Sequence, residues 1–332
     1  MSWQDYFECK NVTRNGKTFN RYDYKYSNVE KLPANLPMPP TDTFYGMFSA
    51  CEKLQDISAL ANWDVSNVRN MSAMFLGCKK LKNISALANW NTRKVTDMDH
   101  MFASCHQLQD ITALSNWDVY NVTDISLMFA GCHQLKDISA LANWDTSSVK
   151  SISEMFNGCH QLKNITALAN WDVSNIKYIS WMFYGCEQLQ DISALSNWDT
   201  SSVTTMYRMF YGCKQLKNVN ALANWDVSNV ESMESMFCKC EELEDITALA
   251  NWDLTRVKNI RDMFSSCTLL PQELQHDASY INTDPFKYMY DILKKETKQQ
   301  ISALQKENAE LKSRLEYLEN KMNILISLSK HC

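Results

Sequence analysis

The sequence lacks a long apolar run, a block of charge of one sign, and any proline between residues 41 and 270. No stretch approaches the roughly 20 apolar residues of a membrane-spanning helix. The first eight residues also lack the basic start and apolar segment of a secretory signal. The formal net charge is −5, and acidic and basic residues are interspersed, so no positively charged region that would attract a polyanion such as nucleic acid is apparent. We therefore predict a cytoplasmic protein with no membrane span and no nucleic-acid partner.

The chain contains a tandem repeat instead. Nine of the twelve cysteines recur every 27 residues, at Cys51, Cys78, Cys105, Cys132, Cys159, Cys186, Cys213, Cys240 and Cys267. Eight tryptophans keep the same period, at Trp63, Trp90, Trp117, Trp144, Trp171, Trp198, Trp225 and Trp252. Cysteines that belong to a repeat do not indicate a disulfide framework, and we expect them to pack as free thiols in a reducing compartment.

The unit reads L-x-x-I-x-A-L-x-N-W-D-x-x-x-V-x-x-M-x-x-M-F-x-G-C, as in Leu81 to Cys105 except at Asn91 and Ser104. Burying the apolar side chains of one unit roughly balances the backbone entropy lost on ordering it, so neighbouring units must supply the stability. Stacked coils then place like residues in columns, about 4.7–4.9 Å apart if the spacing is that of parallel strands. We predict a repeat solenoid with short parallel strands and helical turns.

We assign the short strand to L-x-x-I, as in Leu54 to Ile57, and a helical turn to M-x-x-M-F; V-x-x-M is the alternative place for the strand. The proline-free array agrees with amides that bond between coils. Asn62 and Asp64 fit turns, since such side chains bond to nearby backbone amides. A calcium-binding ladder is the alternative, disfavoured because Asn91 replaces one aspartate.

Glycine often precedes the repeat cysteine, which suggests a positive φ at that position. Other residues occupy the same position in four units, at Ala50, Ser104, Lys239 and Ser266. We therefore expect the conformational demand there not to be strict.

The pattern W-D-x-S-x-V-x-x-M-x-x-M-F-x-G-C-x-x-L, clearest in Trp63 to Leu81 and Trp198 to Leu216, resembles BspA-like leucine-rich repeats. More narrowly it resembles their branch of mycoplasma-type surface lipoproteins, over roughly residues 45–270. The resemblance implies a right-handed leucine-rich-repeat solenoid that binds proteins or surfaces, with no catalytic residues. This chain shows no signal peptide, lipobox or wall anchor, which favours an intracellular adaptor of a protist or a large virus.

Four segments follow from these patterns. Residues 1–46 form an N-terminal cap, with a β-hairpin turning at Asn15-Gly16 and a proline-rich join. The repeats occupy 47–270, and a C-terminal cap with a connecting helix occupies 271–300. That helix begins near Asp284-Pro285. Its apolar face, suited to sealing the last coil, contains Phe286, Met289, Tyr290 and Leu293.

Residues 301–328 predict a leucine zipper. The a positions of its heptads are Ile301, Asn308, Leu315 and Met322, and the d positions are Leu304, Leu311, Leu318 and Leu325. A buried asparagine at a favours a parallel dimer of two strands. Folding of this helix onto its own solenoid is the alternative, and the preceding segment lacks the basic character of a DNA-binding zipper.

A functional site in a repeat array should appear where the pattern breaks. The pair before M-F varies most, and we predict a partner-binding patch there, although exposure alone would also explain the variation. Its candidate residues are Glu154, Trp181, Tyr207, Arg208 and Glu234.

Two other departures from the repeat give only weak support for a functional site. His106, His133 and His160 form a column that would suit a bridging metal, but no second ligand type converges there, so we expect no metal or cofactor. Cys238 beside Cys240 gives weak support to a redox role.

These features predict a non-enzymatic interaction or scaffold protein that forms a homodimer. A structural component of a viral or cellular assembly, or a surface adhesion protein, is the alternative.

Overall fold

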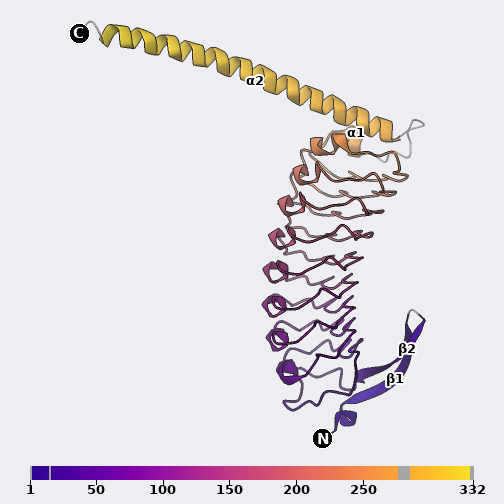
Figure 1. Cartoon of the computed structure of the whole chain (residues 1–332). Coiled ribbons are helices and arrows are strands. Elements are labelled where there is room, and N and C mark those ends of the chain that lie inside the picture. Colours follow the sequence, from indigo (N-terminus) through magenta and orange to yellow (C-terminus); the bar gives the residue numbers. More distant parts are fainter. Residues whose placement is uncertain (1, 15, 276–284, 330–332) are drawn as a thin grey trace. The chain divides into compact units, whose positions relative to one another are not determined.

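The computed structural model describes residues 2–14, 16–275 and 285–329, and in the last range side chains at 294, 298, 301–319, 321 and 322. The chain divides into two compact units, Met1–Asn282 and Thr283–Cys332. The first unit contains a hairpin, a stack of coils and the short helix α1 (Gln272–Gln275). The second contains the helix α2 (Pro285–Ser329). Figure 1 shows the elements of each unit.

The predicted N-terminal hairpin is present and covers the first coil. A single 3-10 turn, η1 (Trp3–Asp5), precedes strands β1 (Phe7–Arg14) and β2 (Lys17–Tyr24), which pair antiparallel from Phe7 with Tyr24 to Arg14 with Lys17. Gly16 has the positive φ of a tight turn, 74°; Asn15 lies outside the described residues. Phe7 is 2% exposed, with its ring 6.1 Å from that of Phe48, so the hairpin seals one end of the core.

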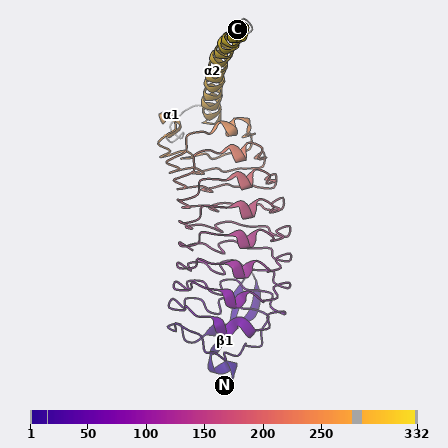
Figure 2. The ribbon, with the colours of Figure 1, turned by 90° about the vertical axis from the view of Figure 1, so that its left-hand side faces the viewer.

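Each coil contains one short 3-10 helix, and these helices stack in a single column (Figures 1 and 2). They are η2 (Ser58–Asn62), η3 (Ser85–Leu87), η4 (Thr112–Leu114), η5 (Ser139–Leu141), η6 (Thr166–Leu168), η7 (Ser193–Leu195), η8 (Asn220–Leu222) and η9 (Thr247–Asn251). The backbone N–H of Ser58 donates to Asp56 Oδ1 at 2.8 Å, and this turn starts η2. The helical turn therefore follows L-x-x-I, and our assignment of it to M-x-x-M-F was wrong.

Neither predicted segment forms an extended strand within the described coils. Single parallel bridges join equivalent residues of successive coils, and the continuous series of bridges runs through V-x-x-M, from Thr43 with Asn70 to Ser232 with Asn259. L-x-x-I contributes isolated bridges such as Asn83 with Asp110. The alternative placement of the β-pairing thus fits better than our first assignment, because the chain bends too soon after Leu54 to Ile57 to extend a strand.

From Met71 to Phe75, every second backbone N–H donates to the next coil and the others donate within their own coil, which explains why the β-pairing is limited to single bridges. The N–H groups of Met71, Ala73 and Phe75 donate to carbonyls of the next coil at 2.8–2.9 Å. The N–H of Met74 instead donates within the coil, to the Met71 carbonyl at 3.2 Å. The N–H of Ser72 donates to Asn70 Oδ1 at 2.9 Å. Backbone donors thus find acceptors without a regular strand.

Two columns of residues have a left-handed backbone. The first contains Ala73, His100, Leu127, Glu154, Trp181, Arg208, Ser235 and Asp262, with φ between 52° and 61°. The second precedes the repeat cysteine, where the glycines and also Ala50, Ser104, Lys239 and Ser266 have φ between 59° and 75°. The conformation is therefore strict although the residue type varies, contrary to our expectation.

The core consists of the predicted columns. Phenylalanine rings from Phe48 to Phe264 stack with centroids 5.5–5.9 Å apart, wider than the strand spacing we expected. Tryptophan and cysteine also bond between coils: Trp171 Nε1 donates to the Leu141 carbonyl at 3.1 Å, and Cys132 Sγ to the Phe102 carbonyl at 3.3 Å. Their copies repeat these contacts, so both residue types satisfy carbonyls of the preceding coil.

The helix α2 begins at Pro285, as predicted, and continues through Ser329. The predicted N-cap Asp284 and the side chains of the sealing face at 286–293 lie outside the described residues. From Pro285 on, the predicted connecting helix and the predicted zipper thus belong to one helix. None of the described helices combines the length and apolar character needed to cross a bilayer.

Candidate interaction surface

Three of the five predicted patch residues lie together. The guanidinium carbon of Arg208 is 4.9 Å from the ring centroids of both Trp181 and Tyr207. The Trp181 and Tyr207 rings meet edge to face at 5.4 Å. The N–H of Trp181 donates to the Tyr207 carbonyl at 2.9 Å, so the bonds between coils fix these two residues side by side.

Three further residues complete the cluster and were missed from the sequence. The Tyr184 ring lies 4.8 Å from Trp181 and stacks on Tyr211 at 4.6 Å. The Lys239 ammonium lies 5.3 Å from the Tyr211 ring centroid, and the Tyr211 hydroxyl raises the pKa of Lys239. The signal was the motif F-Y-G-C, which occurs in two successive units. We name Trp181, Tyr184, Tyr207, Arg208, Tyr211 and Lys239 the aromatic–cation cluster.

Arg208 is half-buried, as are the four rings of this cluster. Its guanidinium also lies 5.5 Å from the centroid of Tyr211. Its Nε is closed off from solvent and has no hydrogen-bond partner among the residues that the structure describes. Rings around a cation add cation–π attraction, which strengthens as water is removed.

The two acidic residues of the predicted patch contact other partners. Asn157 Nδ2 donates to Glu154 Oε2 at 3.0 Å, and Asn259 Nδ2 donates to Glu234 Oε2 at 2.6 Å. Neither carboxylate pairs with Arg208 within the part of the chain that the structure describes. The site is therefore aromatic and cationic, and smaller on its acidic side than the sequence predicted.

Cys238 lies beside this cluster, with 7% of its surface exposed. Burial raises its pKa, Asp262 raises it further, and Lys239 and Arg208 lower it. Cys240 is fully buried, and burial raises its pKa well above the ordinary value. Both are free thiols, and a raised pKa disfavours the reactive thiolate.

The predicted histidine column forms a stack. The rings of His106 and His133 lie 4.6 Å apart and nearly parallel, and those of His133 and His160 lie 4.9 Å apart. Burial lowers the pKa of His133, as do its two neighbours. Rings stacked face to face do not aim their nitrogens at one point. No three His, Cys, Asp or Glu side chains among the described residues are grouped to hold a metal ion.

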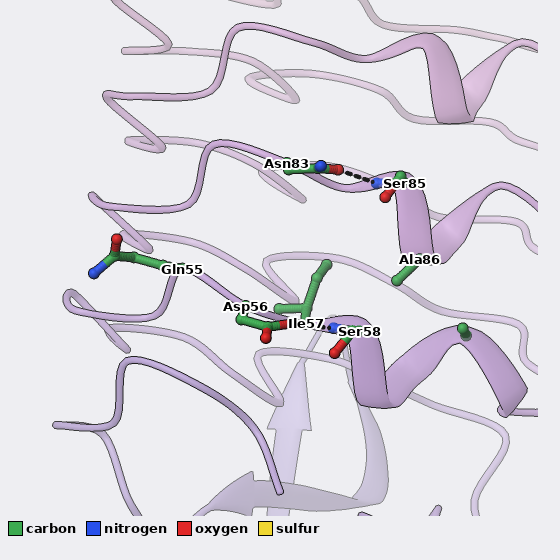
Figure 3. A pocket seen from close by; sticks show the side chains of 8 residues that line it. Gln55, Asp56, Ile57, Ser58, Asn83, Ser85 and Ala86 are labelled. Carbon is green, nitrogen blue, oxygen red and sulfur yellow. Dashed lines mark hydrogen bonds between the residues drawn. The ribbon is translucent and has the colours of Figure 1, made fainter. Parts of the chain in front are cut away.

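Shallow hollows lie between the 3-10 turns of successive coils. One of about 450 Å³, drawn in Figure 3, is lined by Gln55, Asp56, Ile57, Ser58, Ala61, Asn83, Ser85 and Ala86. A second, of about 220 Å³, is lined by Gln109, Asp110, Ile111, Thr112, Asp137, Ser139 and Ala140. The Asp56 and Asn83 oxygens accept the amides of Ser58 and Ser85, so they serve the turns first.

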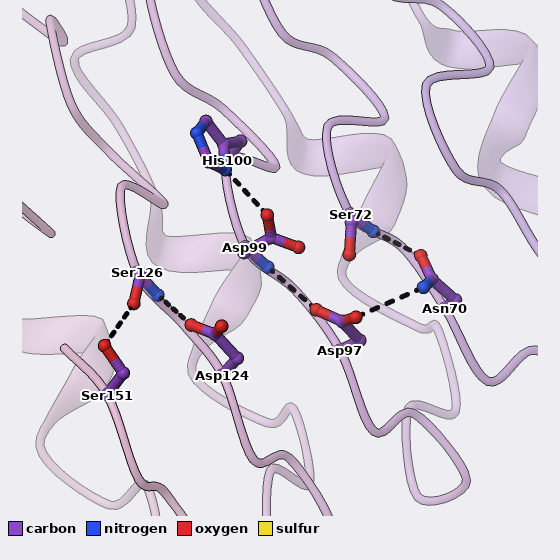
Figure 4. Close-up of polar contacts among 8 residues, drawn as sticks. All are labelled: Asn70, Ser72, Asp97, Asp99, His100, Asp124, Ser126 and Ser151. Atoms are coloured by element: carbon purple, nitrogen blue, oxygen red, sulfur yellow. Dashed lines mark hydrogen bonds and ion pairs between the residues drawn. The ribbon is translucent and has the colours of Figure 1, made fainter. Parts of the chain in front are cut away.

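Polar side chains also gather where the coils bond to one another (Figure 4). The His100 ring lies 2.7 Å from Asp99, whose side chain is 5% exposed, and the Ser126 and Ser151 hydroxyls lie 2.6 Å apart. The backbone N–H of His100 donates to the Ser126 carbonyl at 2.9 Å. Within the described ranges no hydrogen bond joins the His100 ring to a serine hydroxyl, as a histidine that activates a serine nucleophile would require.

The predicted zipper positions lie on α2. Six apolar side chains at a and d positions are 51–59% exposed: Ile301, Leu304, Leu311, Leu315, Leu318 and Met322. Asn308 is also exposed, and the side chain of Leu325 lies outside the described residues. The single helix thus presents an apolar stripe.

Stacked coils with regularly spaced 3-10 turns define a repeat solenoid protein with a C-terminal helix. A family model described as Mycoplasma protein of unknown function, DUF285, matches residues 42–141, 109–195 and 188–306. These matches span most of the chain, and the protein belongs to that repeat family. A search of the curated proteins found no match.

Proposed function

We propose that this chain is a non-enzymatic interaction protein whose solenoid presents the aromatic–cation cluster to a protein partner. The single observation that carries this proposal is the grouping of Trp181, Tyr207 and Arg208 within 4.9–5.4 Å of one another. Tryptophan, tyrosine and arginine are the residue types that most often dominate binding energy at protein interfaces. The proposal includes no cofactor and no nucleic-acid partner.

We propose further that α2 dimerises in parallel as a leucine zipper. The exposed stripe at the a and d positions supports this, because isolated helices rarely leave such a stripe in water. In a parallel pair, Glu307 faces Lys312 of the second copy and Arg314 faces Glu319, and both pairs attract. Pairing of the Asn308 amides would favour two strands in one register.

The motif from Trp63 to Leu81 supports a finer assignment to right-handed BspA-like leucine-rich repeats. A cytoplasmic location is part of the proposal, supported by free thiols at all eleven described cysteines. A surface adhesion protein, as the same repeat type suggests, or a structural component of an assembly is the second candidate. Proximity labelling in the native host distinguishes these by the neighbours it marks.

Two experiments test the proposal. Alanine at Trp181 and Arg208 should abolish partner capture, whereas alanine at the exposed Tyr120 on another coil should not. Capture that survives the double substitution would contradict the proposed surface. Light scattering should give a dimer for the full chain and a monomer for residues 1–295; a truncated chain that is still dimeric would contradict the zipper.

A further inference from the structure

Arg208 has hydrogen-bond donors that no described residue of its own chain engages. A guanidinium carries five N–H donors. Among the described residues Arg208 makes no side-chain hydrogen bond or ion pair, and its contacts are with the three rings at 4.9–5.5 Å. The enclosed Nε has no acceptor among the described residues, which costs free energy. The terminal nitrogens make no hydrogen bond to the described residues either, so their donors are available to an anion.

The carboxylates on the two following coils do not fill this role. Glu234 Oε2 accepts the Asn259 amide at 2.6 Å, and Asp262 Oδ2 lies 3.5 Å from Arg261 Nε. Lys239, with its ammonium 5.3 Å from the Tyr211 ring, adds a second cation to the cluster. The cluster thus combines two positive charges with aromatic surface beside them.

We propose that this cluster binds an acidic segment of a protein partner. One carboxylate would bond to Arg208, and an adjacent apolar side chain would pack on Trp181 and Tyr184. This inference rests on the proposed function and names the chemistry of the partner. Arginine matches a carboxylate with two parallel hydrogen bonds, and the surrounding rings hold the guanidinium in place before binding. A phosphate carries about −1.5 to −2 charge at pH 7 and is typically met by several arginines, whereas this site has one arginine, whose fork matches one carboxylate.

The test is selection of 12-residue phage-displayed peptides on the full chain, followed by anisotropy titrations of the enriched peptides. We expect aspartate or glutamate in each peptide, and a loss of affinity of at least tenfold with Arg208→Gln. Replacing the peptide's acid by its amide should cause a similar loss. Glutamine keeps the unbranched aliphatic stem of arginine at this left-handed position, so urea unfolding should stay close to that of the parent. Arg93→Gln, at an exposed arginine on a distant coil, is the matched control and should leave affinity unchanged.

The outcomes separate this inference from the proposed function. Enriched peptides without an acid, or peptides sensitive to Trp181→Ala but not to Arg208→Gln, would overturn the acidic partner and leave the interaction surface standing. Tenfold tighter binding of a phosphoserine peptide than of its glutamate version would also overturn the carboxylate assignment. No enrichment above a bare surface, or peptides insensitive to both substitutions, would overturn both proposals.

Discussion

Gly77 and Ser104 occupy equivalent left-handed positions, with φ of 75° and 59°, and exchanging their residue types measures the strain in that column. A Cβ added at Gly77 would lie 3.7 Å from the Ala50 Cα, an ordinary contact, so Gly77→Ala adds strain without a clash. A left-handed backbone costs an L-residue about 1–2 kcal/mol. Alanine recovers about 0.4–1 kcal/mol by restricting the unfolded chain. We therefore expect a net loss of about 0.5–1 kcal/mol.

The reverse substitution should stabilise the protein. Ser104→Gly should gain about 0.5–1 kcal/mol, and combining it with Ala50→Gly and Ser266→Gly about 1.5–3 kcal/mol if the sites are independent. Urea unfolding followed by tryptophan fluorescence and by circular dichroism measures the change. Ala88→Gly is the control, because Ala88 has φ of −60° and glycine there should cost about 0.5–1 kcal/mol. A triple variant no more stable than the parent would refute stored strain.

Three further substitutions test other parts of the molecule. The pKa of His133 is lowered in the folded protein, so the unfolded chain binds the proton first and stability falls as the pH drops below the ordinary value of 6.5. The urea midpoint of His133→Gln should therefore change less between pH 7.5 and 5 than that of the parent. An equal change in both proteins would count against the effect of the histidine stack. Trp171→Phe removes the donor to the Leu141 carbonyl and leaves a cavity, and should cost about 2–4 kcal/mol in urea unfolding. Asn308→Val should tighten self-association and permit higher oligomers in sedimentation equilibrium; unchanged association would contradict a buried a position.

The period of 27 residues was sufficient to predict the core, because only stacked coils bring identical side chains together at that interval. It could not place the helical turn. Ser58 follows Asp56 by two residues, and the bond between them starts η2, whereas the methionines of M-x-x-M-F face the core. The hydrogen bonds of Trp171 and Cys132 could not be predicted from the sequence either, because their acceptors belong to the preceding coil.

The candidate site was predictable in part. Trp181, Tyr207 and Arg208 stood out as breaks in one pair of positions, and the structure brings them together. Tyr184 and Tyr211 were overlooked because they lie three residues further along each unit. The left-handed turns at Trp181 and at Arg208 bring side chains three residues apart into contact within one coil, Trp181 with Tyr184 and Arg208 with Tyr211, and the sequence spacing did not show this turn.

The column of buried repeat cysteines can report where this solenoid opens locally. Burial raises the pKa of Cys51 to about 11 and that of Cys267 to about 12, and it raises those of the cysteines between them as well. An alkylating reagent therefore reaches each sulfur only when its own turn of the stack opens. Peptide masses read after timed exposure would give an opening rate at 27-residue intervals and reveal from which end the array comes apart.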